Sequence, residues 1–525
     1  MNTTDNYIIT IYRQRPLLMA GLTMLMIGLP LSLFLTSLSQ FFLAGSFFLE
    51  GSPKEKWKRF ISSGLAWYVA LFWLLHIAGL AWTDDFHEGI KDIRIKLPLF
   101  VLPLVLAGNG PLLHSQFRWL LGVFVAAVVT GTVIHSAVLT GMIPYDVRDV
   151  RDIFIFKISH IRFSLFVCFS IVICYWLAEN SRLLLRVLLF VLIAWLAAFL
   201  LVTASATGLA ILIVLCLVVI FLKVLPRLPT VWLWMVMILL VGAFYVGGRK
   251  IAVAYNKSHE QKEYPGTFSH YSAAGNYYYS DSLNLEHENG YRIWVYISDP
   301  ELEQAWGNSS SISYDSMDLK GQPIRATLIR YMSSKGLRKD ADGFRQLTQE
   351  DIAAVEQGVA NHTYVGISSI ERRLRETLWE LERYRLTGDA NGQSLAQRLE
   401  YWKTARWLIS KHPFVGVGTG DMKSAFEQAY TATQSTLLPQ YRLRSHNQYL
   451  ATTVALGFLG IAFFVIILLT PIASRHPNRD ILFVGFWIIV VLSMITEDTL
   501  ETQPGATFFA AFICFLLYSR MPSKQ

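Results

Sequence analysis

Charged residues are scarce in this sequence. Only 16% of its 525 residues are Asp, Glu, Lys or Arg, whereas soluble domains carry about a quarter. The deficit is concentrated in long apolar runs toward both ends of the chain, and 53% of all residues are hydrophobic. Several runs are long enough to cross a bilayer. The composition therefore predicts an all-α polytopic membrane protein and excludes an ordinary soluble domain.

Cysteine is also rare, and its placement excludes two kinds of site. The chain has four cysteines, all inside apolar runs: Cys168, Cys174, Cys216 and Cys514. A disulfide framework or a zinc site would place them in polar segments at characteristic spacings. Small apolar side chains in helix interfaces are the better interpretation.

A nucleic-acid partner is excluded by where the charge lies. The formal net charge is +8, but the excess Lys and Arg sit in short loops between apolar runs. No basic stripe with interleaved aromatic residues marks a nucleic-acid face. Short basic loops are typical of the cytoplasmic side of a membrane protein, so we expect membrane lipids as partners.

The apolar runs divide the chain into three expected parts. Residues 1–247 should form an N-terminal transmembrane bundle, residues 248–446 one large polar loop, and residues 447–525 the C-terminal transmembrane helices. About twelve spans fit the runs, with both chain ends cytoplasmic and the large loop outside. Apolar residues at helical spacing predict that this loop is mainly helical. Its length indicates a folded domain or a functional segment.

One stretch places reactive side chains at the predicted water–lipid boundary. Residues 444–450 end the polar loop and lead directly into an apolar run. They include Arg444, His446, Asn447 and Tyr449. An imidazole can accept a proton near neutral pH, but Arg and Tyr are also common interfacial anchors. Both interpretations remain open on the residues alone.

Three further segments on the same side are candidate parts of a site, and two of them carry charge. His160 and Arg162 stand at the entry of a span, as functional residues with a partner or as snorkelling anchors. The glycines of residues 416–420 lack a surrounding βαβ unit, so we expect a tight turn rather than a phosphate-binding loop. The acidic turn 497–501 could orient a basic residue or simply be solvated.

The order of these motifs resembles the O-antigen ligase/polymerase family. The resemblance rests on the large loop and on Arg398, Trp402, Pro413, Gly416-Val417-Gly418 and His446-Asn447-Gln448-Tyr449-Leu450. It implies a glycosyltransferase-C-like architecture in the bacterial inner membrane, with an active site facing the periplasm. It also implies a glycan donor linked to undecaprenyl diphosphate, and no metal, nucleotide sugar or other cofactor.

The resemblance further assigns roles to single residues. His446 would act on the acceptor hydroxyl and Arg398 would hold the donor diphosphate. The family often has an Arg in a Ser-Arg-x-Gly turn before a span, where this chain has Ala206. Either Arg162 supplies the missing charge or the donor site is altered. Four residues would have supporting roles: His160, Arg444, Asn447 and Tyr449.

Four activities fit these features. Ligation of O-antigen to lipid A–core is the favoured one, and O-antigen polymerisation and protein O-oligosaccharyl transfer are the alternatives within the family. A polysaccharide transporter or flippase would also be polytopic. Transporters often show paired half-repeats and a midplane ionisable site, and the sequence shows neither. The acceptor, the glycan and the oligomeric state are left open.

The charge bias of the short loops makes a topological prediction. Alkaline phosphatase fused after about residue 350 should be active, because its disulfides form only outside the cytoplasm. A matched fusion at the C-terminus should be inactive. An active C-terminal fusion together with an inactive loop fusion would invert the orientation.

Overall fold

The computed structural model describes most of the chain, and its described part is mostly helical. It covers residues 15–145, 153–156, 158–179, 181–221, 262–265, 269–473 and 480–520, with positions 242, 245, 246, 248 and 249. The chain divides into two compact units. Unit 1 comprises Met1–Tyr145, Arg151–Lys223 and Arg398–Gln525; unit 2 comprises Asp146–Val150 and Val224–Gln397. Residues 398–446 therefore belong to the same unit as the apolar helices. The boundaries expected at residues 248 and 446 concern the membrane topology and stay predictions.

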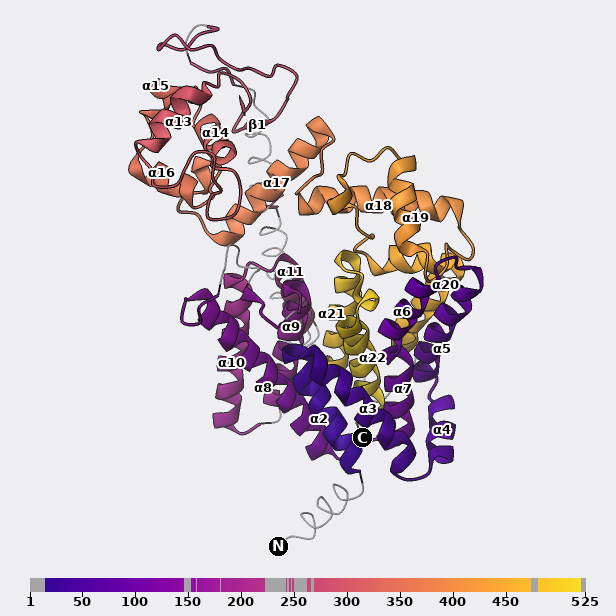
Figure 1. Ribbon diagram of the computed structural model, residues 1–525. Helices are drawn as coiled ribbons and strands as arrows, with labels where there is room; N and C mark the ends of the chain where they lie inside the picture. Colours follow the sequence, from indigo (N-terminus) through magenta and orange to yellow (C-terminus); the bar gives the residue numbers. More distant parts are fainter. Residues whose placement is uncertain are drawn as a thin grey trace. The chain divides into compact units, whose positions relative to one another are not determined.

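Unit 1 is a bundle of apolar helices with shorter polar helices at one end (Figure 1). Its first half contains α2 (Pro16–Leu31), α3 (Leu33–Leu49), α4 (Pro53–Ile61), α5 (Leu65–Ala78), η1 (Gly79–Trp82), α6 (Phe86–Lys96), α7 (Pro98–Asn109), α8 (His114–Leu139), α9 (His160–Glu179), α10 (Leu183–Val202) and α11 (Ala206–Val219). Its second half contains α18 (Ser394–Lys411), α19 (Met422–Ala432), η6 (Pro439–Tyr441), α20 (Gln448–Ala473), α21 (Ile481–Thr496), η7 (Thr499–Glu501) and α22 (Gln503–Tyr518).

The helices confirm a multi-pass membrane protein but not the expected count of about twelve spans. Five helices among the described residues are long and apolar enough to cross a membrane, or six if the bent pair α3 and α4 is one span. Other expected spans form shorter apolar helices, such as α2, α11, α21 and α22. Residues 231–247, an apolar run counted among the twelve expected spans, lie almost entirely outside the described residues.

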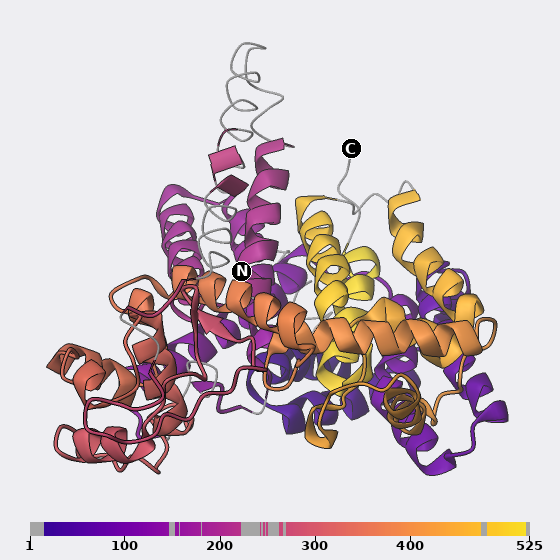
Figure 2. The same ribbon diagram turned by 90° about the horizontal axis from the view of Figure 1, so that it is seen from above.

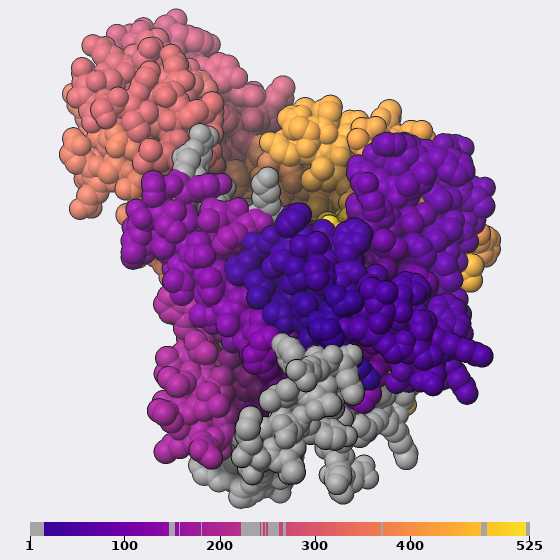
Figure 3. Space-filling model, turned by 60° about the horizontal axis from the view of Figure 1, so that its bottom comes forward, coloured from indigo at the N-terminus to yellow at the C-terminus, as the bar shows by residue number. Residues whose placement is uncertain are grey.

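The α2–α3 hairpin lies on the surface of the bundle. Figure 3 shows it in indigo, flanked by the purple surfaces of other helices of unit 1. Gly28 allows the two helices to touch, since a Cβ there would lie 2.6 Å from the backbone nitrogen of Thr36. Phe34 and Phe41 of α3 are each 75% exposed. Large apolar side chains exposed on a membrane helix are suited to contact lipid tails.

Aromatic side chains fill the space between α9, α21 and α22. The ring of Phe169 in α9 lies 4.8 Å from that of Phe512 in α22, and the rings of Phe486 in α21 and Phe508 in α22 are 5.4 Å apart. All four are buried, and such pairs add about 0.5–1.5 kcal/mol each beyond burial. The yellow helices α21 and α22 lie side by side in Figures 1 and 2. This core fixes the turn that joins them relative to α9.

Helix α20 is broken at Gly457, whose φ of 65° and ψ of −164° are non-helical. The glycine-rich segment before α19 fills the break. Val417 and Gly418 donate backbone hydrogen bonds to the carbonyls of Val454 and Ala455, at 2.8 and 3.0 Å. Irregular backbone at membrane depth is tolerated only where protein groups satisfy it. The segment therefore turns into α19, as its glycines suggested, and also completes α20.

Unit 2 has a hydrophobic core of its own, built around buried Trp306, Leu328 and Tyr331. The sheet pairs two short antiparallel strands in the register His287 with Arg292. The part of the large loop that the structure describes is mainly helical, as expected. The elements of unit 2 are β1 (His287–Glu288), β2 (Tyr291–Arg292), α13 (Asp299–Gly307), α14 (Ile324–Ser334), α15 (Ala341–Phe344), α16 (Gln349–Glu356), η5 (His362–Tyr364) and α17 (Ser369–Thr387).

The break in α20 makes a stability prediction. Gly457→Ala should lower the free energy of unfolding by at least about 2 kcal/mol, because φ is positive and the new Cβ would lie 2.1 Å from the carbonyl oxygen of Phe414. Gly122→Ala is the matched control, since nothing lies within 4 Å of its Cβ position in α8. Thermal unfolding in detergent measures both, and equal midpoints for the two variants would contradict the strain.

Candidate active site

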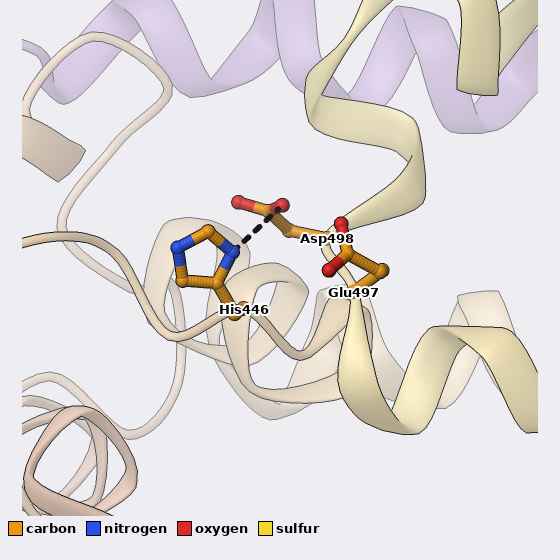
Figure 4. A group of neighbouring side chains, drawn as sticks. All are labelled: His446, Glu497 and Asp498. Carbon is orange, nitrogen blue, oxygen red and sulfur yellow. Dashed lines mark ion pairs between the residues drawn. The ribbon is translucent and has the colours of Figure 1, made fainter. Parts of the chain in front are cut away.

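Four segments of unit 1 meet at one end of the bundle. They are the start of α9, the start of the unit's part of α18, the residues before α20, and the turn between α21 and α22. They contribute Arg162, Arg398, His446 and the acidic pair Glu497 and Asp498. Figure 4 shows the imidazole of His446 facing the two carboxylates. One nitrogen or oxygen from each of these three residues lies within 4.8 Å of the others.

The acidic turn is buried rather than solvated. Glu497, Asp498 and Glu501 are only 6%, 4% and 5% exposed. Buried charges are costly unless they are paired, and each of these carboxylates has a cationic neighbour. The turn therefore orients basic residues, which was one of its two possible roles.

Glu497 lies between the two arginines expected to bind the donor. Its Oε2 is 3.9 Å from Nη2 of Arg162, and its Oε1 is 3.7 Å from Nη2 of Arg398. Both distances are too long for hydrogen bonds. Burial raises the pKa of Glu497 to about 7, Asp498 adds to this, and the two arginines oppose it. The structure thus brings Arg162 and Arg398 to opposite oxygens of one carboxylate.

His446 has a strained backbone and a loosely held side chain. Its φ is +44°, a region that few residues other than glycine adopt and that is common at functional sites. Nδ1 lies 3.7 Å from Oδ1 of Asp498 and makes no hydrogen bond within the part of the chain that the structure describes. The side chain is 32% exposed, so the ring remains accessible.

The surroundings keep the His446 imidazole neutral. Burial lowers its pKa below the ordinary 6.5, Asp498 opposes this, and Arg398, Arg444 and Arg162 lower it further. Arg442, which also precedes His446 in the sequence, lies 6.0 Å from the ring centre of Tyr430. A neutral imidazole is the form that can act as a general base.

Three aromatic side chains of α18 and α19 hold the backbone that leads to His446. They donate hydrogen bonds to alternate carbonyls: Tyr401 to Tyr441 at 2.9 Å, Tyr430 to Leu443 at 2.5 Å and Trp402 to Ser445 at 3.0 Å. Buried Tyr and Trp usually use their polar atoms in this way. These bonds fix the approach of the chain to the strained residue.

The supporting residues Asn447 and Tyr449 anchor α20. The side chain of Asn447 accepts a hydrogen bond from Leu450 N at 3.0 Å and donates one to Ile495 O at 2.9 Å. Tyr449 donates to the Val491 carbonyl at 2.9 Å. Asn447, rather than His446, is therefore the residue that caps α20. Capping does not explain why a histidine stands at 446.

Arg444 belongs to a buried ion network beside the cluster. Its Nη1 lies 3.2 Å from Glu501, which also meets Lys96 at 2.7 Å, and Lys96 meets Asp92 at 2.5 Å. Burial alone would raise the pKa of Glu501, but Lys96 and Arg444 overcome this and lower it to about 2. His160 begins α9, and its described ring contact is with Phe154, at 6.2 Å. That contact does not place His160 beside His446.

Sequence reasoning did not select Asp92 or Lys96, and it named the acidic turn 497–501 without giving Glu497, Asp498 or Glu501 a role of its own. The signals were weak but present. The acidic turn joins two apolar runs, and Lys96 directly precedes another. An ionisable residue at the end of an apolar run often has a charged partner, but the sequence does not say which one.

His446, Glu497 and Asp498 carry atoms of the kind that bind metals. Guanidinium groups nevertheless face these carboxylates from three directions, because Arg162, Arg398 and Arg444 all approach the turn. Their charge opposes a divalent cation and favours an anionic ligand. The arrangement can therefore bind an anion beside a neutral base.

Part of the chain matches a known protein family. Residues 351–465 match the family model described as O-Antigen ligase. This part of the chain is similar to the O-antigen ligase family. The match includes Arg398, His446 and most of α20, in the half where the resemblance was concentrated. No curated protein matches the chain. The match supports glycan transfer of the O-antigen ligase/polymerase kind, and together with the apolar helices it points to a multi-pass membrane protein.

Proposed function

We propose that this protein moves a glycan from undecaprenyl diphosphate to an acceptor sugar, as an O-antigen ligase that uses lipid A–core. The reaction would take place at the periplasmic face of the bacterial inner membrane, without a metal, in a glycosyltransferase-C-like bundle. The observation that supports this most directly is a pair of arginines directed at one point beside a neutral histidine.

The arginines suit the leaving group. In transfer, the bond between the anomeric carbon and the diphosphate oxygen breaks, and the electron pair leaves with the diphosphate. Arg162 and Arg398 would neutralise that charge, because a guanidinium group pairs with phosphate oxygens through two parallel hydrogen bonds. Nε of Arg162 is buried and has no hydrogen-bond partner among the described residues. A donor phosphate would satisfy it.

His446 suits the acceptor. Its neutral imidazole would take the proton of the acceptor hydroxyl while the oxygen bonds to the anomeric carbon. Asp498, 3.7 Å from Nδ1, would stabilise the imidazolium that forms. The ring is close to the two arginines, because Glu497, which lies between them, belongs to the same cluster as His446.

Packing also supports Arg162 as the replacement for the arginine missing at Ala206. Ser205 caps α11 with a hydrogen bond from Gly208 N at 3.4 Å. A Cβ at Gly208 would lie 2.9 Å from Cβ of Ser164 in α9. The turn at Ala206 therefore adjoins the first turns of α9, where Arg162 stands.

A deletion strain tests the choice of activity on a lipopolysaccharide gel. Core without O-antigen, together with accumulating lipid-linked polymer, is the result expected of a ligase. Core carrying one repeat would identify a polymerase, and normal ladders with unglycosylated proteins would identify a protein O-oligosaccharyltransferase. Loss of the ladder with the lipid-linked donor trapped on the cytoplasmic side would identify a flippase.

His446→Asn should reduce transfer by about a hundred- to ten-thousand-fold, the range that general-base catalysis supplies. Asn tolerates a positive φ, so the backbone should be kept while the base is lost. Because burial and arginines lower the histidine pKa below 6.5, wild-type transfer should fall only as the pH drops below about 6.5. His412→Asn, at an exposed position of the same unit, is the control. Full activity of His446→Asn with an unchanged pH profile would end the catalytic role.

Arg162→Ala and Arg398→Ala should each reduce donor use by tens-fold or more, because a charge-assisted hydrogen bond contributes about 1.5–3 kcal/mol. Lysine at either position should fail nearly as badly if the contact is bidentate. Adding Ala206→Arg to Arg162→Ala should restore part of the activity. Arg186→Ala, near the opposite end of α9, is the control. If the Arg162→Ala variant transfers glycan normally, Arg162 is only a snorkelling anchor and does not bind the donor.

A further inference from the structure

Glu497 occupies the position that an anionic ligand of the two arginines would take. Each of its oxygens faces a different guanidinium group, Arg162 at 3.9 Å and Arg398 at 3.7 Å. Its side chain is 8% exposed, whereas those of the arginines are 18% and 23% exposed. The carboxylate therefore lies beneath two cations that remain partly open to solvent.

These two ion pairs are looser than others in the same chain. Arg325 holds Asp299 through two hydrogen bonds of 2.7 and 2.8 Å, and Arg330 meets Glu288 at 2.6 Å. Those are the distances of a good guanidinium–carboxylate pair. Glu497 reaches hydrogen-bond distance to neither of its arginines, and Nε of Arg162 stays unsatisfied among the described residues. Such pairs balance charge without using the hydrogen bonds that the arginines can give.

We propose that Glu497 is an internal substitute for the donor diphosphate. It holds Arg162 and Arg398 in the empty site, gives way when the diphosphate binds, and takes the arginines back when the diphosphate product leaves. This role rests on the proposed function. Glu497 is then a positioning residue that competes with the donor, so it makes binding weaker and product release faster.

The competition depends on the charge of Glu497. Burial, with Asp498, raises the pKa of its carboxyl group to about 7, against Arg162 and Arg398. Among the described residues, His446 lies in the same cluster, and its pKa is lowered. Below about pH 7 the carboxyl group is protonated and stops competing, so the donor should bind more tightly. The rate of glycan transfer should instead fall at low pH, because His446 must be unprotonated to act as the base.

Binding of a soluble diphosphate diester to the full-length protein in nanodiscs tests this. Farnesyl diphosphate esterified to N-acetylglucosamine is suitable, because its own charge does not change between about pH 6 and pH 8. Glu497→Gln keeps the shape and removes the charge. At about pH 8 it should bind the probe on the order of tenfold more tightly than wild type, since two partly exposed ion pairs no longer compete. At about pH 6 the two proteins should bind alike.

Steady-state transfer supplies a second readout. Glu497→Gln should lower KM and also lower kcat, because the diphosphate product stays on the arginines. Glu371→Gln is the matched control, since Glu371 pairs with Arg375 at 2.7 Å on the exposed face of α17. It should change neither quantity. Thermal unfolding shows whether each variant is folded.

The results separate this role from the proposed function. If Arg162→Ala and Arg398→Ala lose the probe but folded Glu497→Gln binds it no better than wild type at about pH 8, the donor site stands and the role of Glu497 is overturned. The same holds if Glu497→Gln keeps the wild-type pH dependence. If wild type does not bind the probe at all, the proposed function and the role of Glu497 fall together.

Discussion

The pairing of a buried acidic turn with basic side chains is the interaction on which this site depends. Glu497, Asp498 and Glu501 are all buried in the short connection between α21 and α22. Removing carboxylates from water costs several kcal/mol each unless cations accompany them. The turn can therefore be buried only if α6, α9, α18 and the segment before α20 bring their basic residues to it. Segments far apart in the sequence therefore meet at this turn, because its buried carboxylates need positive charge.

The rest of unit 1 keeps that turn in place. Aromatic packing of α21 and α22 against α9 sets where the turn begins and ends, as the contact of Phe169 with Phe512 illustrates. Asn447 ties the start of α20 to the end of α21, and the break at Gly457 is closed by the segment that leads into α19. The strained conformation of His446 persists because the backbone on both sides of it is held.

The same arrangement combines an anion site with a neutral base. In the proposed reaction Arg162 and Arg398 neutralise the diphosphate, and they also lower the pKa of the His446 imidazole, which favours its unprotonated form. Glu497 lies between the two arginines and compensates their positive charge. An anion site and a base can thus share a small volume, each helping the other toward its useful charge state.

The sequence by itself determined the membrane class, most of the helical segments and the position of His446 at the end of a polar stretch. Hydropathy and helical spacing are local properties, so they can be read from neighbouring residues. The family resemblance selected Arg398, and the missing arginine at Ala206 directed attention to Arg162. Only the tertiary structure decided that Glu497 joins these arginines, that Asn447 caps α20, and that Lys96 and Glu501 form a buried pair. These features depend on which distant segments of the chain meet: the ion pairs, the hydrogen bonds between helix ends, and the segment that completes the broken helix α20. A local sequence pattern does not contain that information.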